Sequence, residues 1–216
     1  MTETLARQGE APLAGVVGVV LAGGASRRMG HDKAALRIDG EPLVRRAVGR
    51  LRRALAEVVV VGSPALASLV PDTRVIADEW PGRGPLGALA TALRATDAEW
   101  VLLVACDMPF LQAPLIREIA RLALAQPPAE VIAVRGPRGL EPLHAAYARA
   151  CLPLALRQLA GDDVSLRGLL GAARVREMAP EEARRLDPSG LSTLNANTPE
   201  EWERALRLAS EQRQNG

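Results

Sequence analysis

The chain has 216 residues, enough for one large domain with a full hydrophobic core. Apolar residues make up 48% and charged residues 24%, as in ordinary globular proteins, and a net charge of +2 argues against a broad charged surface for nucleic acid or membrane. Three tryptophans, one tyrosine and one phenylalanine are too few rings for a base-stacking surface, which argues further against single-stranded nucleic acid as a partner.

Two cysteines, Cys106 and Cys151, are too few for a disulfide framework in a chain of this length, and their spacing is not that of a metal site. We expect both to be reduced core residues of a cytoplasmic protein, with Cys106 as a nucleophile being the alternative. No apolar stretch reaches the roughly 18 residues that span a bilayer. Residues 1–14 lack the features of a signal peptide and are expected, like residues 209–216, to form a loose tail.

The first predicted elements alternate between strand and helix. The continuous apolar run VVGVVLA predicts a buried strand of the parallel type over residues 16–22. Pro42 then opens a pattern with apolar residues at spacings of three and four, which predicts a helix over 43–55. The run VVVV predicts a second buried strand at 58–61, and a short helix and a third strand at 74–77 follow it.

The alternation continues towards the middle of the chain. Two glycines and two prolines predict a loop over 78–86, which leads into a helix over 86–95. A fourth strand at 100–105, a helix at 113–125 and a fifth strand at 131–134 complete this part. Alternation of this kind predicts an α/β fold with a right-handed, doubly wound, mostly parallel sheet between two layers of helices.

The second half of the chain is less regular. Residues 135–143 are rich in glycine, proline and arginine and suit a loop or hairpin that could cover a substrate. Helical patterns run through 151–160 and 165–170, and 174–178 fits a strand. The chain is expected to close with a helix over 200–208, capped by Thr198 and opened by a proline.

We therefore expect a single domain over residues 15–208, with a regular first half up to residue 134 and a less regular second half after it. In doubly wound sheets, ligands bind beyond the carboxyl ends of the strands. Gly23, Asp78 and Asp107 each follow a predicted strand. The sequence therefore places all three on one rim of the sheet.

Lys33 is the only lysine among the 27 basic residues of the chain. It closes the segment LAGGASRRMGHDK, which follows the first strand. A compact ammonium on a flexible stem and the planar guanidinium of arginine are not interchangeable at a point contact with phosphate. The position of the one lysine, directly behind a strand and a glycine loop, therefore favours phosphate binding over chance.

The glycine segment matches two common phosphate loops poorly. A P-loop needs Ser or Thr directly after its lysine, and the dinucleotide pattern G-x-G-x-x-G is also absent. Gly23 and Gly24 allow the backbone to approach an anion closely, and Arg27, Arg28 and Lys33 supply three cations. We interpret the segment as a triphosphate-binding loop, with a solvated loop as the alternative for the two arginines.

Asp107 ends a buried strand and is expected to face this loop. Mg²⁺ prefers oxygen ligands and commonly binds one or two carboxylates together with substrate phosphates, so Asp107 is a candidate ligand. An N-cap for the following helix is the alternative. Asp78 has two interpretations of the same kind, a ligand or a cap of its own loop.

Four motifs resemble those of a known family. LAGGASRRMGHDK at residues 21–33 is similar to the signature loop of nucleotidyltransferases that share a Rossmann-like glycosyltransferase-A fold. GPLG at 84–87, CDMPFL at 106–111 and NANTPEE at 195–201 are more specific and look like the molybdenum cofactor guanylyltransferase family. The similarity extends over roughly residues 15–208, in the same order.

The resemblance implies transfer of GMP from GTP to molybdenum-molybdopterin with release of pyrophosphate, and it implies Mg²⁺ as the cofactor. It also suggests molybdoenzyme apoproteins or their chaperones as further partners. It assigns nucleotide binding to residues 15–134 and acceptor binding to residues 135–208. The nucleotide contacts it implies are the backbones of Leu21, Ala22 and Gly23 and the side chains of Lys33 and Asp78, and the glycine pair adds the Gly24 backbone. It also implies that Asp107 ligates Mg²⁺, with Asn195 and Asn197 near the metal and the pterin phosphate. Because the departing pyrophosphate needs positive charge, we expect Arg28 to act with Lys33 and Asp107 in catalysis.

One position departs from the family pattern. The family often has Asn at the end of the second strand, where Val61 stands here, so guanine selection would rest on backbone groups or on Ser63. A molybdopterin cytidylyltransferase, or a nucleotidyltransferase acting on another phosphorylated small molecule, is therefore the nearest alternative. A nucleotide-binding regulatory protein without turnover is a third hypothesis, and the presence of Lys33 together with Asp107 argues against it.

Overall fold

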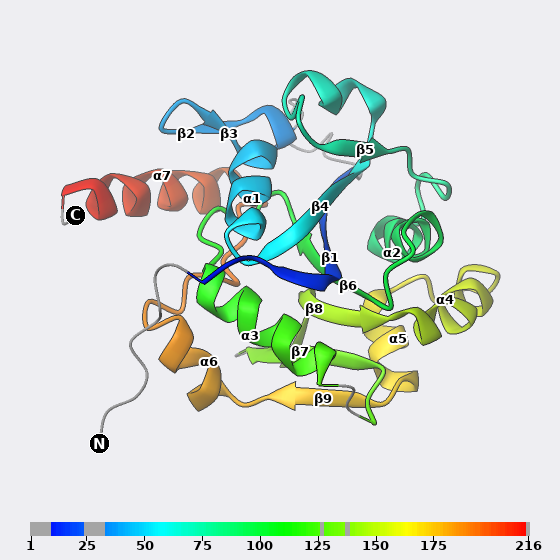
Figure 1. The fold of residues 1–216 in the computed structure, drawn as a ribbon. Coiled ribbons are helices and arrows are strands. Elements are labelled where there is room, and N and C mark those ends of the chain that lie inside the picture. The colour runs from blue at the N-terminus through cyan, green and yellow to red at the C-terminus, as the bar shows by residue number, and fades with distance from the viewer. Residues whose placement is uncertain (1–9, 24–32, 126–127, 137–138, 215–216) are drawn as a thin grey trace.

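The computed structural model describes residues 10–23, 33–125, 128–136 and 139–214. A seven-stranded sheet lies at its centre (Figure 1). The strands are β1 (Leu13–Ala22), β4 (Leu55–Gly62), β5 (Arg74–Ile76), β6 (Trp100–Ala105), β7 (Val131–Gly136), β8 (Gly139–Ala148) and β9 (Val175–Met178). They follow the order β5-β4-β1-β6-β8-β7-β9 across the sheet.

The sheet is mostly parallel, as predicted. β5, β4, β1 and β6 run parallel to one another, and β9 runs parallel to β7. β8 is the exception, because it pairs antiparallel with both β6 and β7. The segment predicted as a loop or hairpin over 135–143 is thus a hairpin between β7 and β8. Its second strand continues to Ala148 in the middle of the sheet, which the sequence analysis missed.

Helices cover both faces of the sheet and form the two outer layers (Figure 1). One layer contains α1 (Leu43–Arg52), α3 (Ala113–Leu124) and α6 (Pro180–Leu186). The other contains α2 (Gly84–Ala95), α4 (Leu152–Leu159) and α5 (Leu166–Ala172). Alternate residues of β1 enter the two cores: Val16 and Val20 pack with α1 and α3, while Val17 and Val19 pack with α2.

Two predicted boundaries were wrong. Leu55 begins β4 and does not end α1, because the helix stops at Arg52 and the chain turns into the sheet. α2 begins at Gly84 and not at residue 86, with Pro85 in its first turn, where a missing N–H costs nothing. The sequence analysis did not predict α6. The described residues also contain three short 3-10 segments, η2 (Lys33–Ala35), η3 (Pro64–Ser68) and η4 (Arg149–Cys151), of which only the short helix at η3 was predicted.

A small hairpin and the last helix form a third hydrophobic cluster at one edge of the molecule. β2 (Arg37–Ile38) and β3 (Glu41–Pro42) are joined by Asp39 and Gly40, whose φ values of 55° and 77° are those of a type I′ turn. α7 (Pro199–Gln214) packs against this hairpin. The cluster consists of Ile38, Leu43, Phe110, Ala196, Ala205 and Ala209. It fixes the segment before α7 against the loop that follows β6.

The terminal segments are more ordered than predicted where the structure describes them. α7 continues to Gln214, so the tail expected from residue 209 begins inside a helix. Leu13 and Ala14 already belong to β1, while residues 1–9 and 215–216 lie outside the described residues. No helix within the described ranges is long and apolar enough to cross a membrane.

Both cysteines are buried thiols, as predicted. Burial raises the pKa of Cys151 to about 12, and its Sγ donates to the backbone carbonyl of Glu130 at 3.3 Å. Cys151 is therefore a poor nucleophile at neutral pH. Cys106 lies in the core below α3, and its backbone N–H donates to the Leu21 carbonyl at 2.9 Å.

His144 is a fully buried titratable side chain in β8, opposite Val104 of β6. Neither ring nitrogen meets hydrogen-bond geometry with another group of the described chain. Burial lowers the pKa of His144 to about 4. The nearby Asp187 carboxylate and the Ser192 backbone oppose this shift but do not cancel it. The folded protein therefore keeps this ring neutral at pH values where an unfolded histidine is protonated.

We expect the free energy of unfolding to fall as the pH is lowered from 6.5 towards about 4, because the unfolded chain then binds a proton that folded His144 does not. This difference in pKa corresponds to about 3 kcal/mol. His144→Leu should lack that part of the pH dependence. Urea denaturation of both proteins across this pH range provides the measurement. Identical pH slopes for the two proteins would contradict the expectation.

Candidate active site

The carboxyl ends of β1, β4, β5 and β6 meet at one edge of the sheet, because these strands are parallel and adjacent. Gly23 follows β1, Ser63 follows β4, Asp78 lies two residues beyond β5, and Asp107 lies two residues beyond β6. The predicted rim is therefore confirmed for the described residues. Gly24, Arg27 and Arg28 lie outside them, so the expected contribution of these residues stays a prediction.

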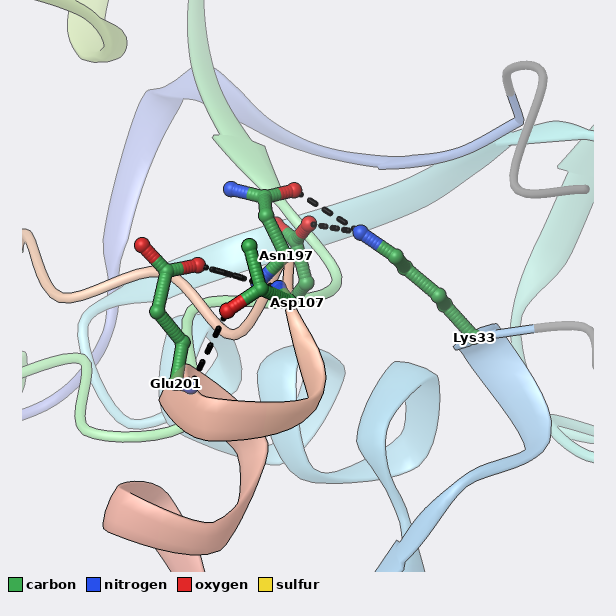
Figure 2. Close-up of polar contacts among 5 residues, drawn as sticks. Lys33, Asp107, Asn197 and Glu201 are labelled. Atoms are coloured by element: carbon green, nitrogen blue, oxygen red, sulfur yellow. Dashed lines mark hydrogen bonds and ion pairs between the residues drawn. The ribbon is translucent and has the colours of Figure 1, made fainter. Parts of the chain in front are cut away.

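Lys33 begins the short segment η2 and extends towards the end of β6 (Figure 2). Its ammonium Nζ lies 2.8 Å from Oδ1 of Asn197 and 3.5 Å from Oδ2 of Asp107. The Lys33 and Asp107 side chains are only 12% and 14% exposed. Residues from the start, the middle and the end of the chain thus meet around one cation.

Asp107 is fixed by its backbone on one side and by Lys33 on the other. Its carbonyl oxygen accepts a hydrogen bond from the N–H of Ala196 at 3.0 Å, which ties the loop after β6 to the segment before α7. Burial raises the pKa of Asp107, while the Lys33 ammonium opposes this shift. The alternative role as a helix cap is excluded, because α3 has Gln112 at its N-cap position.

Asn197 is held in place by a capping box at the start of α7. Oε2 of Glu201 accepts from the backbone N–H groups of Asn197 at 2.7 Å and Thr198 at 3.2 Å, and Oγ1 of Thr198 accepts from the Glu201 N–H at 3.2 Å (Figure 2). This confirms Thr198 as the cap. The reciprocal bonds fix the backbone of Asn197, so that its carboxamide reaches Lys33.

Asn195 contributes a buried acceptor. Its Oδ1 has no hydrogen-bond partner among the described residues, although the residue as a whole is partly exposed. A buried carbonyl oxygen left unpaired is costly, and such groups commonly await a ligand, an ion or a water molecule. The arrangement agrees with a binding role for Asn195, and the nature of its partner stays a prediction.

The oxygens around Lys33 are of the kind that bind a divalent cation. Oδ2 of Asp107 and Oδ1 of Asn197 both face the same ammonium, so they already form a site for positive charge. Carboxylate and amide oxygens are the ligands that Mg²⁺ accepts, and Mg²⁺ usually needs few of them when phosphates and water complete its shell. Among the described residues, no group of three or more His, Cys, Asp or Glu side chains forms a separate metal site. The donor set therefore fits Mg²⁺ bound together with a polyphosphate.

Asp78 acts as a loop cap. Its Oδ1 accepts from the backbone N–H of Trp80 at 2.9 Å and from Oγ1 of Thr91 at 3.2 Å. Thr91 also accepts from the N–H of Glu79 at 3.0 Å, so the hydroxyl connects α2 to the loop. A contact between Asp78 and the nucleotide stays a prediction. The sequence analysis did not single out Thr91, because a threonine within a helix gives no signal of this role.

Arg46 is a second residue whose part in the site was missed. Its Nε donates to the carbonyl of Pro109 at 3.0 Å, within the loop that follows Asp107. Its guanidinium also lies within 4.0 Å of the carboxylates of Asp39 and Glu41 in the β2–β3 hairpin. The sequence places Arg46 on the polar side of α1, and only the tertiary structure shows that it connects the hairpin to the Asp107 loop.

Val61 does not lie at the rim, although the sequence analysis drew attention to it. Its side chain is 1% exposed and packs in the core beneath α2. The rim residue after β4 is Ser63, whose Oγ accepts from the N–H of Ala65 at 3.4 Å and caps η3. Val61 itself therefore offers no polar group to a base, and selection of guanine by backbone groups or Ser63 stays a prediction.

Two glycines at the ends of β1 and β4 have different structural roles. A Cβ added to Gly62 would lie 2.6 Å from the Ala22 carbonyl oxygen, so the close approach of the two strands requires glycine there. A Cβ added to Gly23 would meet only Cα of Gly62, at the ordinary contact distance of 3.6 Å. Packing within the described residues therefore does not require glycine at position 23, and a contact between its backbone and a ligand stays a prediction.

We expect Gly23→Ala to leave the folded state as stable as the wild type but to weaken binding of a GTP analogue by at least about tenfold, equivalent to about 1.4 kcal/mol. Gly62→Ala is the matched control, because its clash should cost about 1–3 kcal/mol of folding free energy. Thermal unfolding and titration with a fluorescent GTP analogue separate the two effects. Unchanged nucleotide affinity in Gly23→Ala would refute a ligand-contact role for the Gly23 backbone.

A mostly parallel sheet with Gly23, Lys33 and Asp107 at one rim is typical of a nucleotide-binding α/β domain of the nucleotidyltransferase type. The chain belongs to the family of the MobA-like NTP transferase domain, whose model matches residues 18–178. The matched region contains most of the rim, while Asn195 and Asn197 lie beyond it.

Individual relatives agree with this assignment. A probable molybdenum cofactor guanylyltransferase of Pelotomaculum thermopropionicum is 34% identical over 197 residues, which cover 91% of this chain and 94% of the relative. One of Opitutus terrae is 37% identical over 201 residues, covering 89% and 95%. The crystal structure of molybdopterin-guanine dinucleotide biosynthesis protein A from Archaeoglobus fulgidus has a TM-score of 0.78, covering 90% of this chain and 99% of that one. At 24% identity it supports the fold alone.

Proposed function

We propose that this protein transfers GMP from GTP to molybdopterin carrying molybdenum, which forms the guanine dinucleotide of the cofactor and releases pyrophosphate. The observation that carries the proposal is the meeting of Lys33, Asp107 and Asn197 at the rim of the sheet. The relatives that match along about nine-tenths of the chain are named molybdenum cofactor guanylyltransferases, which supports the choice of donor and acceptor.

The reaction is an in-line displacement at phosphorus. A phosphate oxygen of the pterin attacks the α-phosphorus of GTP and forms the new P–O bond. The bond between the α-phosphorus and the bridging oxygen breaks, and pyrophosphate leaves with the electron pair. The attacking phosphate is already ionised at neutral pH, so no protein base has to remove a proton. This agrees with a site whose described part contains no exposed histidine, since His144 is buried in the core.

The protein would therefore contribute positioning and charge. Lys33 would neutralise phosphate oxygens, and we propose that Arg28 assists it as the pyrophosphate leaves. Mg²⁺, held by Asp107 with Asn197 nearby, would supply further positive charge on the same oxygens. The backbones of Leu21, Ala22 and Gly23 would hold the nucleotide, and Asn195 would face the metal and the pterin phosphate.

Release of pyrophosphate tests the proposal. The protein is incubated with GTP and Mg²⁺, once with molybdenum-molybdopterin and once without it. We expect release only when the acceptor is present, together with the guanine dinucleotide as product. Equal release without the acceptor would indicate hydrolysis of GTP. No release under either condition would favour a nucleotide-binding protein without turnover.

Asp107→Asn tests the proposed metal ligand. We expect the mutant to be slower and to need higher Mg²⁺ concentrations, because the carboxylate charge is lost. We also expect it to be at least as stable as the wild type at neutral pH. The folded-state pKa of Asp107 is raised by burial, so ionisation of this group costs folding free energy as the pH rises through that pKa. Mg²⁺ titration of the rate and urea denaturation are the two measurements. Identical Mg²⁺ curves would mean that Asp107 is not a ligand.

We also propose that the enzyme acts in the cytoplasm and that its product passes to molybdoenzyme apoproteins or their chaperones. The two reduced, buried thiols agree with a reducing compartment. The partner proteins follow from the proposed product, since a completed cofactor has to reach an apoenzyme.

A further inference from the structure

Lys33 has a contact in this structure that phosphate binding alone does not explain. Its ammonium lies between Oδ1 of Asn197 and Oδ2 of Asp107, the oxygens that fit Mg²⁺. Figure 2 shows the three side chains converging from separate segments of the chain. Lys33 thus serves as an internal counter-ion for Asp107, and this role competes directly with the role of Asp107 as a metal ligand.

The two cations cannot share these oxygens. Mg²⁺ binds oxygen at about 2.0–2.1 Å and demands near-ideal octahedral geometry. An ammonium at hydrogen-bond distance from the same carboxylate and amide would lie within a few ångströms of the ion, in a partly buried site where water screens like charges weakly. Lys33 therefore has to leave the Asp107 carboxylate before a metal can take its place.

The triphosphate supplies the means of removing Lys33. Lys33 directly follows the glycine segment, and its flexible four-carbon stem lets the ammonium reposition while its backbone stays in η2. Phosphate oxygens of the nucleotide offer the ammonium stronger acceptors than one carboxylate and one amide. The nucleotide can thus draw Lys33 away and at the same time bring oxygens that complete the metal's coordination shell.

We propose that Lys33 blocks the metal site of the free protein, so that a divalent cation binds Asp107 tightly only together with the triphosphate. The inference rests on the proposed function in one respect, the assignment of Asp107 as the metal ligand. The contact also stabilises the free protein. Burying the charged Asp107 carboxylate without a partner would cost folding free energy, and the Lys33 ammonium compensates its charge. Lys33 is then both a phosphate ligand and a determinant of the order of binding.

Binding of Mn²⁺ in the absence of nucleotide tests this proposal. Mn²⁺ serves as the probe because the free ion gives an electron paramagnetic resonance signal that is lost on binding. We expect Lys33→Met, which keeps the stem and removes the charge, to bind Mn²⁺ about tenfold more tightly than the wild type. This is within the usual range for coupling between two binding events. Lys33→Arg keeps a cation at this position and should bind Mn²⁺ as weakly as the wild type.

One further variant and one further condition complete the experiment. Asp107→Asn combined with Lys33→Met should lose the gain, which assigns the bound ion to Asp107. A non-hydrolysable GTP analogue should raise the Mn²⁺ affinity of the wild type more than that of Lys33→Met, because the mutant has no block to relieve. Thermal unfolding confirms that each variant is folded.

The proposal is overturned if Lys33→Met binds Mn²⁺ no more tightly than the wild type without nucleotide, or if the gain persists when Asp107 is also replaced. These titrations contain no acceptor and involve no turnover. A failure here therefore leaves guanylyl transfer untouched, and an absence of guanylyl transfer would leave the metal competition measurable.

Discussion

We expect Lys33→Ala to lower the rate of guanylyl transfer by about 10² to 10³, the usual effect of removing one preorganised electrostatic stabiliser from an active site. The loss arises because negative charge develops on the leaving pyrophosphate and the ammonium no longer compensates it. The fold should persist, since Lys33 lies at the rim and outside the three hydrophobic clusters. Steady-state rates of pyrophosphate release, with circular dichroism to check folding, provide the measurement.

Lys33→Arg is the matched control for charge. It keeps the cation near Asp107, but a planar guanidinium cannot reproduce the point contact of a compact ammonium with phosphate, so we expect activity well below that of the wild type. A folded Lys33→Ala protein with near-normal activity would remove Lys33 from the mechanism.

GTP should be preferred over CTP and ATP by about 30-fold or more. Guanine presents an N1–H and a 2-amino group, both donors, which backbone carbonyls at the end of β1 can accept. Adenine and cytosine do not present this pair, so two carbonyls covered by the bound nucleotide would stay unpaired, at roughly 1–3 kcal/mol for each orphaned group. Rates with each nucleoside triphosphate and molybdenum-molybdopterin provide the comparison.

The structure narrows the choice of these carbonyls. The Leu21 carbonyl already accepts a hydrogen bond from the Cys106 N–H at 2.9 Å, so we expect the carbonyls of Ala22 and Gly23 to read the base. The buried Val61 side chain has no polar group to read a base, so selection would rest on these backbone carbonyls. Equal or faster turnover with CTP would favour a cytidylyltransferase. The prediction that backbone carbonyls at the end of β1 select guanine would then be wrong.

The rim was predictable because it depends on the strands alone. Runs of buried valines fixed β1 and β4, and parallel strands bring their carboxyl ends to one edge. Gly23, which follows β1, and Asp107, which lies two residues beyond β6, could therefore be placed together without knowledge of any contact. Thr198 was recognised as a cap for a similar reason, since capping depends on a local pattern.

Contacts between distant segments were not predictable from local patterns. The hydrogen bond between Lys33 and Asn197 depends on how α7 packs against the β2–β3 hairpin, which the sequence analysis did not detect. The Asp-Gly pair at residues 39–40 was the available signal for that hairpin. β8 was missed because its last part, HAAYA, is rich in alanine, which favours helices, and only its antiparallel pairing with β6 and β7 makes it a strand.

The fate of the α-phosphate of GTP tests the central claim most directly. GTP labelled with ³²P at the α-position is incubated with the protein, Mg²⁺ and molybdenum-molybdopterin, and the pterin fraction is then separated. We predict that the label appears in the pterin dinucleotide and that a γ-label leaves with pyrophosphate. Recovery of the α-label only in free GMP or GDP, with none joined to the pterin, would contradict the account.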